Sequence, residues 1–540
     1  MSGRRSSTST TRRWPSWSAR WPSGSRSSCR PRSAERGRRV MSSAIYLSVV
    51  VVATAGLVYE LLAAAAASYL LGDSITQFST VIGAYLFAMG IGSFLSRYVR
   101  RGVAARFVEV EIAVGLVGGW ATTLLFVAFG QTPHFRVVLY GLVGVVGVLV
   151  GLEIPLLLRL LRGRLAFSEL VARVLSLDYA GALVASLLFP LLLVPRLGLI
   201  RTSLLMGLAN AAVGVWSTWL FRRELGRPVI LRGLGVVVVL ALAAGTLAAE
   251  RITGWAEERL YADEIILTKS SAYQRIVLTR WSDDLRLYLN GHLQFSSRDE
   301  YRYHEALVHP ALAAHPAPRR VLVLGGGDGL AAREILRYPT VASITLVDLD
   351  AEMTRLFAGN PLLRELNGGA LDDGRLRVVN ADAFIWLQAS RETFDVAIVD
   401  FPDPHNFSLG KLYSRTFYRL LRARLAPDGL AVVQATSPMF ARRSFWCINE
   451  TIRSAGLAAR PYHVYVPSFG EWGFVLAAAG DWAPPRAYPP GLRFLTVEGT
   501  AALFGFPPDM AAVPVEINRL DNQILVHYYG AEWQRISPPL

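Results

Sequence analysis

Cysteine is scarce in this sequence. Only two occur among 540 residues, Cys29 and Cys447, and they lie in different regions of the chain. Two distant thiols cannot build a disulfide framework, and they lack the close spacing of a cysteine metal site. Both classes are therefore excluded, and we expect no metal ion.

Acidic residues are outnumbered by basic ones. The chain has 41 Asp and Glu against 56 Lys and Arg, a net charge of +15. Such a charge can indicate nucleic-acid binding. Here, however, the arginines gather in the N-terminal tail and in loops between apolar segments, a pattern typical of membrane topology. We therefore expect no nucleic-acid partner.

The first 40 residues lack any apolar periodicity. They contain eleven arginines and many serines, so we predict that residues 1–40 are a disordered basic tail. Two explanations stay open: a targeting or lipid-binding arm, or a translation start assigned too early. The second is favoured by Met41, which stands directly before the first apolar segment.

Long apolar runs fill residues 41–250. With 52% hydrophobic residues, the chain is too apolar for an all-soluble protein. Seven apolar segments are centred at residues 45–70, 77–97, 107–130, 136–161, 176–195, 198–221 and 230–249. Each approaches the ~20 residues that a helix needs to cross a bilayer. We predict a transmembrane domain of about seven helices in a multi-pass protein of the cell membrane.

Loop charge predicts the orientation of these helices. Loops 98–106, 159–173 and 222–232 are rich in arginine, whereas loops 71–76 and 131–135 contain no Lys or Arg. The first three loops should face the cytoplasm. Strict alternation of seven spans then places the C-terminal part of the chain outside.

A few acidic residues interrupt the apolar segments: Glu60, Glu111, Glu153 and Asp178. Charges at this depth are costly and often line a polar pathway, so a cation-conducting cavity is one interpretation. The other is that each acid pairs with an arginine near a membrane interface. The sequence favours neither.

Beyond the membrane segments the apolar pattern changes to alternation. Between Glu264 and Phe295 apolar and polar residues alternate, and Asn290-Gly291 is typical of a tight hairpin turn. We predict a small antiparallel β domain over residues 260–300.

A nucleoside-binding βαβ unit follows. Val321 to Leu324 read as a buried parallel strand, followed by a glycine-rich turn and a helix from Leu330 to Arg337. The next apolar run, Ser343 to Val347, ends at Asp348, where an acid can bind ribose hydroxyls. The NAD fingerprint is excluded because position 330 is Leu. We predict a doubly wound α/β domain over residues 301–480.

Five acids are expected at one edge of the predicted sheet. A strand from Phe394 to Val399 leads directly into Asp400 and Asp403. The other three acids are Asp328, Asp348 and Asp382. A phosphate site needs the opposite charge, so the ligand should carry positive charge.

Taken together, these motifs resemble the spermidine synthases, the polyamine aminopropyltransferases. The resemblance spans Ile265 to Ala479 and rests on motifs in family order: Gln274 in AYQR, Tyr303-His304-Glu305, GGGDG, Asp348, Asp382-Ala383 and the D-x-x-D-P loop. It implies a Rossmann-like, methyltransferase-type fold. It also implies transfer of the aminopropyl group of decarboxylated S-adenosylmethionine to a polyamine, putrescine above all, with release of methylthioadenosine.

The resemblance also implies a role for each matching residue. Asp400 is the expected catalytic residue, accepting a proton from the amine. The expected polyamine-binding residues are Tyr303, His304, Asp328 and Asp403. The expected nucleoside-binding residues are Gln274, Gly325, Gly327, Asp348, Asp382 and Ala383. No bound cofactor is implied, because the nucleoside is a co-substrate, and a homodimer or homotetramer is expected.

The chain departs from the family pattern in two places, which leaves the acceptor amine open. His405-Asn406-Phe407 replace a glycine-proline segment beside the adenine. The late gate segment, residues 466–474, lacks the usual tyrosine, although Glu471 can supply polarity there. The C-terminal extension, residues 481–540, is expected to pack on the domain, the alternative being a cover over the site.

Two other functions compete with aminopropyl transfer: an S-adenosylmethionine methyltransferase, and a non-catalytic membrane sensor or transporter of polyamines. Location adds a conflict, because the donor nucleoside is made in the cytoplasm while loop charge places the C-terminal part outside. We expect a cytoplasmic catalytic domain, with apolar segments five and six forming a shallow or re-entrant pair near Pro190 and Pro195.

Overall fold

The structure is a computed structural model that describes residues 32–71, 74–129, 131–132, 134–162, 166–252, 261, 263–271, 273–480 and 482–536. The predicted disordered tail falls largely outside these residues, as does Cys29. The prediction of disorder is wrong for the last part of this tail, because the first helix, α1, already begins at Arg32. Ala, Glu and Arg are strong helix formers and extend the apolar helix backwards.

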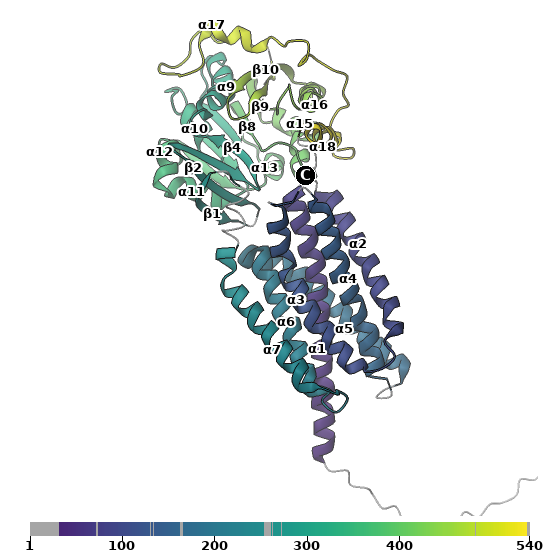
Figure 1. The fold of residues 1–540 in the computed structure, drawn as a ribbon. Coiled ribbons are helices and arrows are strands. Elements are labelled where there is room, and N and C mark those ends of the chain that lie inside the picture. Colours follow the sequence, from purple (N-terminus) through teal and green to yellow (C-terminus); the bar gives the residue numbers. More distant parts are fainter. Residues whose placement is uncertain are drawn as a thin grey trace, which may run out of the picture. The chain divides into compact units, whose positions relative to one another are not determined.

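Long apolar helices form the first half of the chain (Figure 1). They are α1 (Arg32–Leu71), α2 (Ser74–Leu95), α3 (Val103–Phe129), α4 (Phe135–Leu160), α5 (Phe167–Leu188), α6 (Val194–Leu220) and α7 (Pro228–Leu247). A short helical turn, Ser96–Tyr98, follows α2, and a π-helical turn, Phe189–Leu193, joins α5 to α6. In the described residues six helices are long and apolar enough to cross a membrane. The protein is therefore a membrane protein.

The fifth of these helices is a 54-residue stretch, Phe167–Leu220. At 1.5 Å per residue it exceeds twice the thickness of the hydrocarbon core, which is about 30 Å. It is divided at Gly198, whose φ of 72° and ψ of 177° are not helical. Segments five and six of the sequence are thus joined by helical turns and a break rather than by a loop.

Two of the arginine-rich loops lie at the same end of the helix bundle. Arg159, at the end of α4, donates to the carbonyl oxygens of Ser96 and Val99, which follow α2. Alternating spans predict this arrangement, because both loops should face one side of the membrane.

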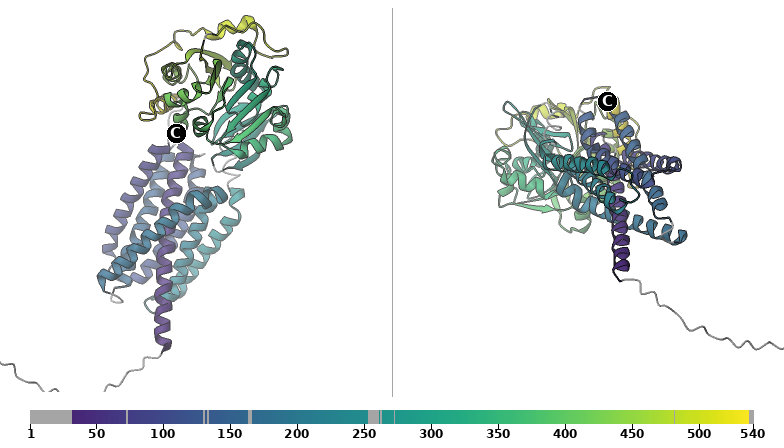
Figure 2. Two further views of the ribbon diagram at one scale, coloured as in Figure 1. Left: turned by 180° about the vertical axis from the view of Figure 1, so that it is seen from behind. Right: turned by 60° about the horizontal axis from the view of Figure 1, so that its bottom comes forward.

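Small residues allow the bundle helices to approach closely. A Cβ added at Gly115 of α3 would lie 2.8 Å from the carbonyl oxygen of Gly207 of α6. Between α2 and α4, a Cβ at Gly151 would lie 2.1 Å from the carbonyl oxygen of Met89. Such backbone contacts are typical of membrane helices. The bundle helices remain side by side in the turned views (Figure 2).

The predicted β domain is a four-stranded antiparallel sheet in the order β1-β2-β3-β4. Its strands are β1 (Glu264–Ser270), β2 (Arg275–Trp281), β3 (Asp284–Leu289) and β4 (His292–Ser296). The predicted turn is confirmed: Asn290 and Gly291 both have positive φ, 51° and 83°. Two adjacent positive φ angles give the twist that a two-residue hairpin requires.

The α/β domain contains a seven-stranded sheet in the order β10-β11-β9-β8-β5-β6-β7. Its strands are β5 (Arg320–Gly325), β6 (Ser343–Asp348), β7 (Leu376–Asn380), β8 (Phe394–Asp400), β9 (Leu425–Gln434), β10 (Ala458–Val466) and β11 (Gly470–Ala478). β5 to β9 pair in parallel and β10 and β11 are antiparallel. The chain leaves β5 first to one side and then to the other, so β5 and β8 flank the switch point where such sheets bind ligands.

Helices accompany the sheet. They are α9 (Glu300–Ala314), α10 (Leu330–Ile335), α11 (Ala351–Gly359), α12 (Pro361–Leu366), α13 (Ala383–Ala389), α14 (Phe407–Gly410), α15 (Arg415–Arg422), α16 (Arg442–Ser454), α17 (Val497–Thr500) and α18 (Ile524–Ile536). The 3₁₀ turns are Ala370–Asp372, Lys411–Tyr413 and Ala501–Phe504. Two buried apolar clusters contain residues of the seven-stranded sheet. A third joins the β domain to α10, α11 and α12.

Candidate active site

The turn after β5 is shaped by glycines whose surroundings leave little room for a side chain. Gly325 lies opposite Asp400 of β8, with a φ of 82°, and an added Cβ would come within 2.1 Å of the carbonyl oxygen of Asp400. At Gly327 an added Cβ would lie 2.7 Å from the Asp348 carboxylate. Glycine therefore lets three strand ends converge on one point.

Asp348, at the end of β6, is held by backbone donors. Its carboxylate accepts from the N–H of Gly327 at 3.1 Å and from the N–H of Asp350 at 2.8 Å. Burial raises the pKa of Asp348 to about 6, although these two hydrogen bonds oppose the shift. Gln274 of the β domain donates to Asp350 at 2.9 Å. The structure thus brings Gln274 beside the predicted ribose-binding acid.

Asp400, at the end of β8, is the expected proton acceptor. The hydroxyl of Tyr303 in α9 donates to its Oδ1 at 2.6 Å. Burial raises the pKa of Asp400 to about 6, and the negative charge of Asp328 acts in the same direction. His304 and the Tyr303 hydrogen bond oppose the rise. A carboxylate with a raised pKa is a stronger base for an ammonium proton.

His304 is buried near Asp328 and Asp400. Its Nδ1 lies 2.8 Å from Oε2 of Glu300, and Arg333 holds the same carboxylate at 2.9 and 3.0 Å. Burial acts to lower the pKa of His304, but the Glu300 carboxylate outweighs burial and raises it. Burial raises the pKa of Asp328, which His304 opposes. His304 thus connects Asp328 and Asp400 electrostatically.

Asp403 is surrounded by three hydrogen-bond donors from distant parts of the chain. Thr436 and Tyr529 donate to its Oδ2 at 2.9 and 3.0 Å, and Gln434 donates to its Oδ1 at 3.2 Å. Burial raises the pKa of Asp403 to about 6, and the three donors oppose the shift. Thr436 has a φ of 60°, which is strained for a β-branched residue. Strain of this kind is concentrated at functional sites.

Asp382 follows β7 and caps α13. Its Oδ1 accepts from the N–H of Phe384 at 2.8 Å, and its Oδ2 lies 2.6 Å from Nζ of Lys411. Although burial alone would raise it, Lys411 holds the pKa of Asp382 below its usual value. The next residue, Ala383, is buried. The carboxylate is therefore ionised at neutral pH and already has a cationic partner.

Comparison with known proteins identifies this arrangement. Residues 300–483 match the model of the spermine/spermidine synthase domain. The chain is 58% identical over 515 residues to polyamine aminopropyltransferase 1 of Ralstonia nicotianae, covering 94% of this chain and 97% of that protein. It is 54% identical over 496 residues to the polyamine aminopropyltransferase of Leptospira interrogans, covering 92% of this chain and 100% of that protein. The chain belongs to the polyamine aminopropyltransferase family.

Among solved structures, the crystal structure of spermidine synthase from Thermotoga maritima is 27% identical to the chain. It has a TM-score of 0.42, with coverage of 45% of this chain and 85% of that chain. The full-length relatives decide the family. Polyamine aminopropyltransferases act on a polyamine and on decarboxylated S-adenosylmethionine, so membership excludes the methyltransferase and non-catalytic alternatives.

The two departures from the family pattern each have a structural role here. His405 stacks on His292 of the β domain, with ring centroids 4.7 Å apart, and burial lowers the pKa of His405 to about 4. Glu471, expected to supply polarity to the gate, lies 2.8 Å from Nδ1 of His463 instead. His405 and Glu471 therefore each have a partner within the protein.

The sequence did not reveal three donors to Asp403 in this aminopropyltransferase: Gln434, Thr436 and Tyr529. The first two follow directly from the position of β9 beside β8, which the sequence alone did not provide. Tyr529 lies in α18, within the C-terminal extension that was expected to pack on the domain. The extension does pack, through Leu525 and Tyr528, and it also supplies a hydrogen-bond donor to Asp403.

Proposed function

We propose that the protein transfers the aminopropyl group to a diamine, putrescine by preference, with Asp400 as the proton acceptor. The observation that carries this proposal is the position of Asp400 at the switch point, hydrogen-bonded to Tyr303 and close to Asp328. A polyamine is almost fully protonated at neutral pH, because its amines titrate near the lysine value of about 10.4. The site must bind a cation and then remove one of its protons.

The site aspartates divide into two groups by their partners. Asp348 is tied to the glycine turn, and Asp382 to the start of α13, which suits a nucleoside. Asp328, Asp400 and Asp403 have raised pKa values and form no ion pair with an arginine or lysine of the described residues, which suits an amine. Holding the amine in line with the sulfonium supplies most of the rate enhancement by positioning.

The test is the substitution Asp400→Asn. It should abolish release of methylthioadenosine, because loss of a general base typically costs about 10²–10⁴ in rate. Binding of methylthioadenosine should stay nearly unchanged, since Asp348 and Asp382 are intact. A variant that keeps more than half of the wild-type turnover would contradict the role of Asp400. Asp428→Asn, an exposed surface change, serves as the control.

For the orientation in the membrane, we infer a cytoplasmic catalytic domain because the donor nucleoside is made there. A catalytic domain on the same side as the N-terminus requires an even number of crossings, so the stretch Phe167–Leu220, which is broken at Gly198, would cross the membrane once. An arrangement in which both pieces cross would place the end of α7 opposite the N-terminus and remove the enzyme from its donor.

A further inference from the structure

Two carboxylates lie inside the helix bundle without a cationic partner. Glu111 of α3 and Glu153 of α4 are 0% and 4% exposed. In the described part of the chain neither forms an ion pair with an Arg, Lys or His. One or both interact electrostatically with Tyr59 of α1, Tyr85 of α2 and Asp178 of α5, none of which can carry positive charge. An uncompensated charge at this depth is costly, and a buried acid avoids the cost by taking up a proton.

One amide contacts both carboxylates. Nδ2 of Asn210 in α6 donates to Oε2 of Glu111 at 3.1 Å and lies 3.5 Å from Oε1 of Glu153. The other end of the amide, Oδ1 of Asn210, is buried and has no hydrogen-bond partner, and the same holds for Oε1 of Glu111. Buried polar atoms normally have a partner. The two unpaired oxygens thus belong to the same two side chains that Nδ2 already joins, and both can only accept a hydrogen bond.

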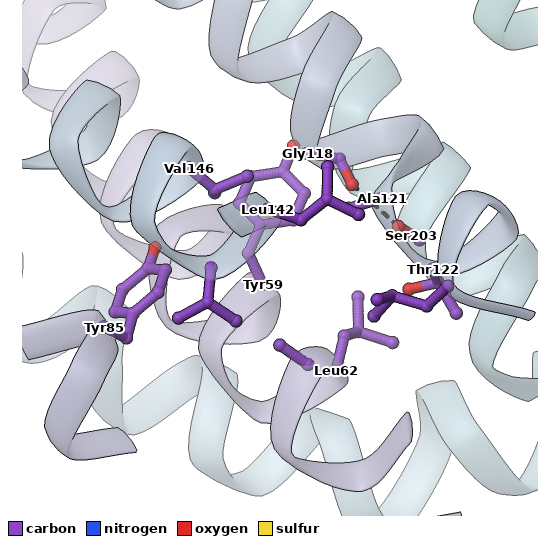
Figure 3. A pocket seen from close by; sticks show the side chains of 12 residues that line it. Tyr59, Leu62, Tyr85, Gly118, Ala121, Thr122, Leu142, Val146 and Ser203 are labelled. Atoms are coloured by element: carbon purple, nitrogen blue, oxygen red, sulfur yellow. Dashed lines mark hydrogen bonds between the residues drawn. The ribbon is translucent and has the colours of Figure 1, made fainter. Parts of the chain in front are cut away.

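The donor that these oxygens lack cannot come from the cavity in the bundle. That cavity has a volume of about 20 Å³ and is lined by none of the three side chains just described (Figure 3). Its lining residue Gly118 follows Glu111 by seven residues on α3, a rise of about 10 Å. At Glu111 itself the helices pack closely, since a Cβ added to Gly214 of α6 would lie 3.2 Å from the Cβ of Glu111. A proton suits this position, because it needs no space beyond the side chains already in contact.

We propose that Glu111 and Asn210 form a proton-binding site in the membrane part, in which Oε1 of Glu111 carries the proton and donates to Oδ1 of Asn210. Nδ2 of Asn210 already donates to Oε2 in the opposite direction, so the acid and the amide become joined by two hydrogen bonds. One proton gives both unpaired oxygens a partner and removes the charge of Glu111. The ligand of this site is therefore H⁺ and not a larger cation.

The bound proton changes how three helices are joined. Asn210 connects α6 to α3 through Glu111 and to α4 through Glu153. With Glu111 neutral, the site carries at most the single charge of Glu153. Loss of the proton would place two like charges beside one amide and leave two buried oxygens unpaired again. The packing of these helices should therefore be most stable when the proton is bound.

The test is infrared difference spectroscopy on the full-length protein in detergent at about pH 8. The active-site aspartates with pKa values of about 6 are then ionised and give no carbonyl band of a protonated acid. The spectrum of wild type minus that of Glu111→Gln should show such a band. In Asn210→Leu the band should move to higher frequency, because the O–H group loses its acceptor. The control is Glu109→Gln, on the same helix, which should remove no band because Glu109 is exposed and paired with Arg106.

The melting temperatures of the same proteins give an independent result. The amide introduced by Glu111→Gln can pair with Asn210 as a protonated acid does, so this variant should fold and keep the wild-type melting temperature. Failure of Glu111→Gln to fold, or absence of the acid band in wild type, would overturn the proposal, since Glu111 would then be ionised. A sodium-dependent rise in the melting temperature of wild type that Glu111→Gln lacks would also overturn it, because a metal cation would then occupy the site.

Discussion

The hydrogen bond from Tyr303 to Asp400 gives a specific prediction for the pH dependence of catalysis. Tyr303→Phe removes a donor that lies 2.6 Å from the carboxylate and keeps the aromatic ring. A hydrogen bond to the ionised form stabilises that form and lowers the pKa. Its loss should therefore raise the pKa of Asp400 and move the acidic limb of activity to higher pH.

The size of the shift follows from the strength of the bond. A hydrogen bond to a charged group contributes about 1.5 kcal/mol, and 1.36 kcal/mol corresponds to one pKa unit. The pKa of Asp400 should rise from about 6 to about 7. At pH 6 the ionised fraction then falls from about one half to about one tenth, a roughly fivefold loss of kcat/KM that disappears at high pH.

The assay is methylthioadenosine release across pH 5 to 9 with limiting amine. In wild type, Asp400 and Asp403 both titrate near pH 6, so log(kcat/KM) should fall with a slope approaching two below that pH. In Tyr303→Phe the pKa values of Asp400 and Asp403 should differ, so kcat/KM should fall in two separate steps as the pH is lowered. Tyr488→Phe, which loses a hydroxyl bonded to Thr500, should leave the profile unchanged. An equal loss at every pH would show that Tyr303 acts by positioning alone, and the reasoning above would be refuted.

Three further outcomes are expected. Glu305→Gln should lower the free energy of unfolding by about 2 kcal/mol, measured by denaturant titration, because the Glu305 carboxylate accepts from the N–H groups of residues 493–495 at 2.7 to 3.0 Å; an unchanged midpoint would contradict this. A fragment of residues 260–540 should be soluble and bind methylthioadenosine, since its three apolar clusters contain no residue of α1 to α7; an insoluble fragment would show that the membrane part is needed. Reporter fusions at Glu250 and at the C-terminus should fluoresce in the cytoplasm, whereas alkaline phosphatase activity there would place the catalytic domain outside.

Much of the sheet edge was predictable because a parallel strand is a short apolar run with a defined end. The strands ending at Gly325, Asp348 and Asp400 were all predicted within a residue or two, and the carboxylates of Asp348 and Asp400 both lie against the glycine turn. β7 was not recognised, because Leu376–Asn380 is only partly buried and carries a weak apolar pattern. Asp382 was placed at the sheet edge without a predicted strand before it, and its nucleoside-binding role was inferred from the resemblance.

Side-chain pairings were harder to predict than strand ends. Lys411 and Asp382 are far apart in sequence, as are Tyr529 and Asp403, and no local pattern links either pair. The partners of the acids in the membrane helices were equally hard to predict from the sequence. The sequence left open whether Glu111 and Glu153 pair with arginine, and only the helix packing shows Asn210 as their neighbour.

The contact between Tyr529 and Asp403 has a consequence for how the enzyme is made. Tyr529 lies 126 residues after Asp403 in the chain, so Asp403 leaves the ribosome well before the residue that donates to it. The apolar helices have by then long emerged and entered the bilayer. The hydrogen bond to Asp403 therefore forms late in synthesis, and a chain terminated before Tyr529 would occupy the membrane without it.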